Sequence, residues 1–172
     1  MKRIVSLIAM ISLMSVAYVA PNGKTLAQAP THAGGSADQT DFQRYDGSYF
    51  ARNDSGLKGK SSYLVLTTQA QFDAIFHPAA TMGHNTFLPD KTFDTKMVVA
   101  AIYRADYLRK YDVTKVTAKG TALYVSYTFK DDSPGSARFN SPLILTVDRN
   151  HYSRVVFVAN GKVARVVRVA PA

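Results

Sequence analysis

The chain has 172 residues and a formal net charge of +9, and it contains neither cysteine nor glutamate. Without cysteine it can form no disulfide, no thiolate metal site and no cysteine nucleophile, and it lacks the residue that carries the lipid of a lipoprotein. Without glutamate it has neither the HExxH motif of zinc peptidases nor the usual acid of glycosidases.

The first 27 residues have the pattern of a secretory signal peptide. A short basic start precedes an apolar run over residues 4–20, and small residues follow at Ala27 and Ala29. This order is typical of a cleaved export signal. Cleavage after Ala27 is favoured, because cleavage after Ala29 would leave Pro30 at the cut. We predict a signal peptide over 1–27 and a periplasmic or secreted product; an uncleaved anchor is the alternative, since about 17 apolar residues are near the minimum for a membrane span.

Removal of the signal peptide lowers the net charge by three, from +9 to +6, because two lysines and one arginine leave with it. A basic exported protein suits contact with anionic lipids or glycans of the envelope. Basic residues spread over the surface for solubility are the simpler interpretation. The charges are scattered and the product is exported, so we expect no nucleic-acid partner, and after cleavage no membrane-spanning segment.

Residues 28–40 are small, polar and without periodicity, which predicts a flexible leader before a single β-rich domain over 41–172. The first compact strand is expected over 62–67. A helix of about ten residues follows, with Thr68 as its N-cap, Gln71 three residues on as in a capping box, and Pro78 at its end.

The remaining domain is a series of strands. A continuous apolar run over 96–103 predicts a strand covered on both faces, with Met97, Val99 and Ala101 on one face and Val98, Ala100 and Ile102 on the other. Further strands are expected over 111–118, 123–130, 143–148, 155–158 and 163–169. Asn160-Gly161 between the last two predicts a tight hairpin. The fold class is therefore mainly β (α+β), an antiparallel β-sandwich or barrel-like sheet with one short packed helix.

No catalytic motif is present: the chain has no GxSxG elbow, no P-loop and no GxGxxG. Asp131 and Asp132 lie in a Pro-Gly turn and are interpreted as solvated turn residues. A weak divalent-metal candidate is formed by His84, Asp90 and Asp94 in a long loop. No cofactor is expected.

Residues 104–111 combine positive and aromatic side chains between two strands, as a binding loop for an anionic or glycan ligand would. The candidate binding residues are Arg104, Tyr107, Arg109, Lys110 and Tyr111. The loop over 81–94 is the second candidate contact surface. An ordinary exposed connection whose tyrosines cap the sheet is the alternative.

Three segments carry a family likeness: TTQAQFDAIF, FDTKMVVAAIYR and SPLILTVDR. With their order, residues 57–160 resemble the C-terminal domain of the PrcB-like protease-complex subunits, which are bacterial exported proteins. Where that family tends to have a glycine-rich segment after the central strand, this chain has Ala105-Asp106-Tyr107-Leu108. The resemblance implies a non-catalytic accessory or binding module and no catalytic residues.

We therefore expect an exported, non-enzymatic binding or accessory domain that contacts an envelope or secreted protein such as a protease. Two alternatives remain open. One is a small metal-dependent envelope hydrolase centred on the 81–94 loop, and the other is a binder of anionic glycan or lipid.

Overall fold

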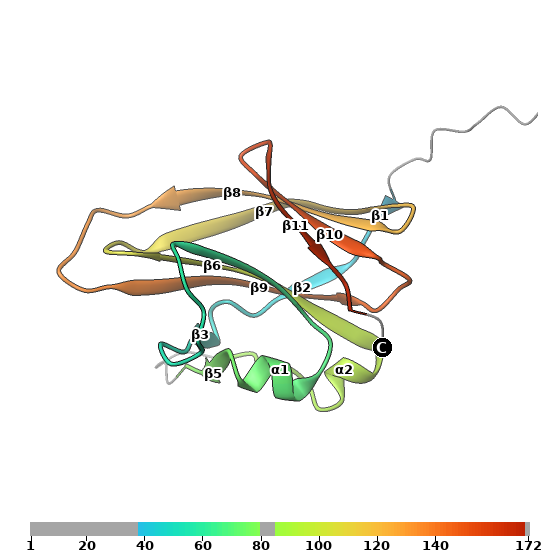
Figure 1. Cartoon of the computed structure of the whole chain (residues 1–172), viewed down its shortest axis with the longest axis horizontal. Helices are drawn as coiled ribbons and strands as arrows, with labels where there is room; N and C mark the ends of the chain where they lie inside the picture. Colours follow the sequence, from blue (N-terminus) through green and yellow to red (C-terminus); the bar gives the residue numbers. More distant parts are fainter. Residues whose placement is uncertain (1–37, 80–84, 171–172) are drawn as a thin grey trace, which may run out of the picture. The chain divides into compact units, whose positions relative to one another are not determined.

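Residues 38–79 and 85–170 are described by a computed structural model, and within them the chain forms eleven strands and two short helices (Figure 1). The predicted signal peptide, residues 28–37 of the predicted leader and His84 lie outside these ranges.

Two sheets account for most of the domain. Sheet A has the strand order β1-β7-β8-β10-β11, and sheet B has the order β2-β9-β6-β4. The strands of sheet A are β1 (Asp38–Gln39), β7 (Arg109–Lys119), β8 (Ala122–Asp131), β10 (Arg154–Ala159) and β11 (Lys162–Arg168). The strands of sheet B are β2 (Phe42–Arg44), β4 (Ser61–Leu66), β6 (Lys96–Ala105) and β9 (Phe139–Asp148).

The remaining elements form a third layer on the side of sheet B that faces away from sheet A (Figure 1). They are the paired strands β3 (Tyr49–Ala51) and β5 (Phe76–Pro78) and the helices α1 (Gln69–Asp73) and α2 (Thr92–Thr95). The mainly β, sandwich-like fold with a packed helix is thus confirmed.

Strand β6 lies at the centre of this arrangement, between β9 and β4 in sheet B. Met97 and Val99 pack into the core between the two sheets, whereas Val98 and Ile102 pack into the core beneath the helical layer. Both faces are buried, as its continuous apolar sequence predicts. Because both faces of β6 are buried, the hydrophobic effect joins all three layers through this one strand.

Helix α1 is shorter than predicted. Thr68 is its N-cap and accepts a hydrogen bond from the backbone N–H of Gln71, and the Gln71 side chain accepts one from the N–H of Thr67. The helix ends at Asp73, however, and Phe76–Pro78 forms β5 against β3. The residue before a proline disfavours the helical conformation, and a helix of five residues is too short to persist without packing. The segment Phe76–Pro78 therefore pairs with β3 as a strand and does not extend the helix.

Two further differences concern strand pairing. Asp38 and Gln39 pair with β7, so the predicted leader is ordered at its end, before residue 40. Strand β10 pairs with β8 in parallel, whereas a wholly antiparallel fold was predicted. The reason is that β9, which lies between them in sequence, belongs to the other sheet, so the chain crosses over and returns in the same direction as β8.

The turn between β10 and β11 confirms the predicted hairpin and allows a test. Asn160 has a φ of 48° and Gly161 a φ of 76°. Because a side chain at positive φ meets the following carbonyl, Gly161→Ala should lower the free energy of unfolding by about 1–2 kcal/mol in urea titrations. Gly47→Ala is the control, since Gly47 has no positive φ and no atom within 4 Å of an added Cβ. Equal stabilities of the two variants would contradict this account.

Candidate functional site

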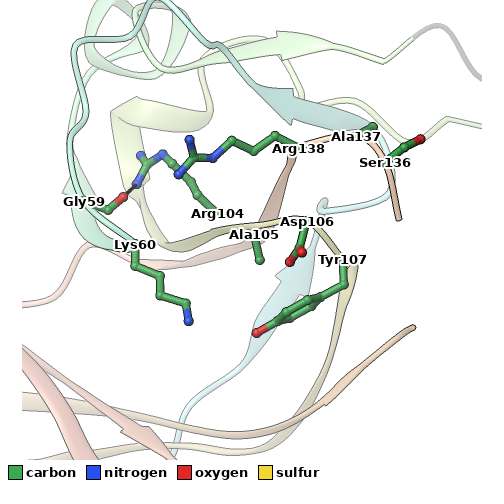
Figure 2. A pocket seen from close by; sticks show the side chains of 9 residues that line it. All are labelled: Gly59, Lys60, Arg104, Ala105, Asp106, Tyr107, Ser136, Ala137 and Arg138. Atoms are coloured by element: carbon green, nitrogen blue, oxygen red, sulfur yellow. Dashed lines mark hydrogen bonds between the residues drawn. The ribbon is translucent and has the colours of Figure 1, made fainter. Parts of the chain in front are cut away.

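A hollow of about 610 Å³ opens at one end of the sandwich, where three connections meet (Figure 2). We call it the basic hollow. Its lining residues come from the approach to β4, from the end of β6 with its turn into β7, and from the loop before β9. They are Gly59, Lys60, Arg104, Ala105, Asp106, Tyr107, Ser136, Ala137 and Arg138.

Backbone hydrogen bonds hold these connections together. The N–H of Arg104 donates to the carbonyl of Lys60 at 2.9 Å, and the N–H of Gly135 donates to the carbonyl of Asp106 at 2.6 Å. The walls of the hollow are therefore tied to the ends of strands, which is a common way for loops on a rigid scaffold to present binding groups.

Two arginines meet in the hollow without a carboxylate partner. Arg104 donates from Nη1 to the carbonyl of Gly59 at 2.9 Å and to Oγ of Ser62 at 3.1 Å. Burial and the nearby charge of Arg138 lower the pKa of Arg104, and Figure 2 shows the two guanidinium groups close together. The hollow also contains Asp106, but among the described residues no ion pair joins it to either arginine.

Elsewhere in the described part of the chain, the ion pairs use other residues. They are Arg44–Asp46, Arg52–Asp54, Lys96–Asp148, Arg109–Asp131 and Lys110–Asp132. The two arginines of the hollow thus differ from these five cations, because neither of them forms an ion pair with a described carboxylate.

A third cation and two tyrosines lie beside them. Nζ of Lys60 is 5.3 Å from the ring centroid of Tyr103, and the hydroxyls of Tyr103 and Tyr107 are 2.8 Å apart. The interaction with the Tyr103 phenol raises the pKa of Lys60. Lys60 therefore remains charged at neutral pH, and the hollow presents three positive groups.

The predicted binding loop over 104–111 is divided by the structure. Strand β6 continues to Ala105 and β7 begins at Arg109, so only three residues form the turn. Arg104 and Tyr107 line the basic hollow. Arg109 and Tyr111 belong to β7 and not to the predicted loop, and because side chains alternate along a strand, these two face sheet B.

Arg109 is held on every side by the protein itself. Its guanidinium carbon is 3.5 Å from the ring centroids of both Tyr103 and Phe129. Its Nε and Nη2 donate to the two carboxylate oxygens of Asp131 at 2.6 and 2.7 Å. Asp131 is the last residue of β8 and the ion-pair partner of Arg109. Its interpretation as a solvated turn residue is therefore wrong.

Tyr111 and Lys110 have different surroundings. The Tyr111 hydroxyl donates to the carbonyl of Ser141 at 3.2 Å, and burial raises the pKa of this phenol. Lys110 points to the opposite, exposed face of sheet A, where it pairs with Asp132. Neither residue lines the basic hollow.

Two of the three predicted metal candidates lie in a different hollow. Asp90 and Asp94 line a second hollow of about 560 Å³, together with the cations Lys91 and Arg149, whereas His84 lies outside the described residues. Within residues 38–79 and 85–170, no three histidine or acidic side chains lie together as metal ligands would. None of the helices in these ranges is long and apolar enough to cross a membrane.

Sequence reasoning missed Lys60 and Arg138. Each is a basic residue just before a strand, but nothing in their local sequences indicates that they meet Arg104. Comparisons with protein-family models, with curated proteins and with solved structures find no match to this chain.

Proposed function

We propose that the chain is an exported, non-catalytic binding domain that contacts a partner protein of the envelope or the secreted fraction, and that an acidic segment of this partner binds in the basic hollow. The observation that carries the proposal is the convergence of Arg104 and Arg138 without a carboxylate partner among the described residues. The predicted signal peptide supports the location, and the resemblance to PrcB-like subunits supports an accessory role.

Electrostatics favours a carboxylate as the group that is bound. Two guanidinium groups near each other destabilise the unliganded domain, and an anion between them removes that repulsion. Arg138 is exposed and donates no hydrogen bond to a described residue, so its planar fork is available for bidentate contact with a carboxylate.

The rim of the hollow favours a peptide over a small inorganic anion. Tyr107 lines the hollow, and the next residue of the turn, Leu108, is 44 % exposed. An acidic peptide segment with an adjacent apolar residue would contact both Tyr107 and Leu108. These aromatic and aliphatic contacts would add to the affinity that the charges provide.

Titration with an acetylated tetra-aspartate peptide tests this proposal. The chain from Gln28, which is the predicted mature form, would be labelled with ¹⁵N, and shifts are expected at Lys60, Arg104, Tyr107 and Arg138. Arg138→Gln should weaken binding about tenfold, since it removes a charge-assisted hydrogen-bonding group. Arg138 donates no hydrogen bond to a described residue, and its removal relieves the repulsion with Arg104, so the melting temperature of the variant should not fall.

The matched control is Arg149→Gln, which removes one positive charge just beyond the end of β9 that lies opposite the basic hollow. It should bind the peptide as the unaltered chain does. A partner recovered from envelope extract should likewise be retained by the control and lost with Arg138→Gln. Equal binding by both variants, or peptide shifts confined to other residues, would overturn the proposal.

A further inference from the structure

A second basic surface lies on the outer face of sheet A, which is the face turned away from sheet B. Val155 and Phe157 point into the core between the sheets, so the alternate residues of β10 point outward. Because directly paired residues share a face, the register of sheet A shows which side chains lie side by side on it.

The register places a row of cations across four strands. Lys119 of β7 pairs with Ala122 of β8, and Ala122 pairs on its other side with Arg154 of β10. Arg154 in turn pairs with Arg168 of β11. All three cations are exposed. Arg154 and Arg168 are directly opposite each other, and like charges in that position destabilise a sheet.

A second like-charge pair and few acids add to this field. Lys110 lies opposite Lys130 in the pairing of β7 with β8. The outward basic side chains of the strands are Lys110, Lys115, Lys119, Lys130, Arg154 and Arg168. The strands contribute one outward carboxylate, Asp112, and Asp132 beyond β8 pairs with Lys110. The positive charge of this face is therefore largely uncompensated.

Apolar side chains lie next to the cation row on the same face. The adjacent row contains Tyr124, Val156 and Val166, and the row after it contains Val158 and Val163. Val163 is 63 % exposed and Val166 49 % exposed. Figure 1 shows the helices and the β3–β5 pair on the sheet B side, away from this face. Exposed apolar residues flanked by cations are typical of an interaction surface.

We propose that the outer face of sheet A docks peripherally on an anionic lipid bilayer. The cation row would contact lipid phosphates, and Val163 and Val166 would enter the interfacial region. A bilayer fits this face better than one acidic segment does, because it presents repeated negative groups together with apolar surface over a flat area. This inference uses a different face from the basic hollow and does not rest on the function proposed above.

Sedimentation with vesicles tests the inference on the chain from Gln28. We expect binding to vesicles of phosphatidylcholine with phosphatidylglycerol, weak binding to phosphatidylcholine alone, and release as salt screens the charges. The double variant Arg154→Gln, Arg168→Gln should lower the partition coefficient about tenfold or more. It removes a repulsive pair, so its melting temperature should not fall.

Two further variants make the result decisive. Arg104→Gln with Arg138→Gln removes two charges at the basic hollow and should leave vesicle binding unchanged. Val163→Ser with Val166→Ser should weaken vesicle binding while the cation row stays intact. Equal binding to neutral and anionic vesicles, or unchanged binding by the Arg154/Arg168 variant, would overturn the inference. Binding to soluble polyglutamate without binding to vesicles would assign the face to an acidic polymer and would also overturn it.

Discussion

Phe157→Ala is expected to lower the free energy of unfolding by about 3–5 kcal/mol. Phe157 of β10 is fully buried between the two sheets, and its ring centroid is 5.0 Å from that of Tyr63 in β4. The pair therefore joins sheet A to sheet B near their β11 and β4 edges. The truncation would remove this contact and leave a cavity that the surrounding strands cannot fill. Urea denaturation followed by circular dichroism measures the loss.

Phe157→Leu is the matched control, because it keeps most of the apolar volume and should cost less than about 1.5 kcal/mol. A loss below about 1 kcal/mol for Phe157→Ala would mean that this part of the core between the sheets is loosely packed. It would contradict the assignment of Phe157 as a link between the sheets.

Arg109→Ala is expected to lower the free energy of unfolding by about 2–3 kcal/mol, although the sequence predicts a binding role for this residue. The change removes two hydrogen bonds to Asp131 and the contacts with the rings of Tyr103 and Phe129. Arg109→Lys should recover only part of the loss, because an ammonium lacks the planar fork.

Lys110→Ala provides the neighbouring control. Lys110 pairs with Asp132, but 71 % of its side chain is exposed, so its removal should change stability by less than about 1 kcal/mol. If both variants unfolded at the same urea concentration, the structural role of Arg109 would be refuted. The Lys110→Ala variant should still bind the acidic peptide at the basic hollow.

The contribution of the Arg109–Asp131 pair should also depend on pH. The hydrogen bonds and charge of Arg109 lower the pKa of Asp131 in the folded protein. A carboxyl group with a lowered pKa stabilises the fold above its unfolded pKa of about 4, and this contribution is lost as the pH falls through the folded pKa. The stability difference between the unaltered chain and Asp131→Asn should therefore be largest near neutral pH and shrink in acid. A difference that stays constant into strong acid would contradict this linkage.

The candidate site was only partly predictable from the sequence. The cluster of basic and aromatic residues after the central strand includes Arg104 and Tyr107, which line the basic hollow; their binding role stays a prediction. It could not predict that Arg109 and Lys110 lie on opposite faces of sheet A. Strand β7 starts earlier than predicted, and side chains alternate between the two faces along a strand. Lys60 and Arg138 join the site through tertiary contacts alone.

The sequence by itself determined the features that depend on neighbouring residues. The burial of β6 on both faces follows from its continuous apolar run, the start of α1 from the Thr68 cap, and the last hairpin from Asn160 and Gly161. Hydrophobic periodicity, capping and positive φ are local properties, so a single sequence carries them.

Tertiary structure alone decided which distant segments meet. The end of α1 depends on pairing of β5 with β3, and the parallel placement of β10 beside β8 depends on the passage of β9 through the other sheet. The basic hollow and the cation row across sheet A likewise exist only in the folded register. The choice of neighbour for each strand is made by the packing of whole sheet faces, which brings together segments far apart in the sequence.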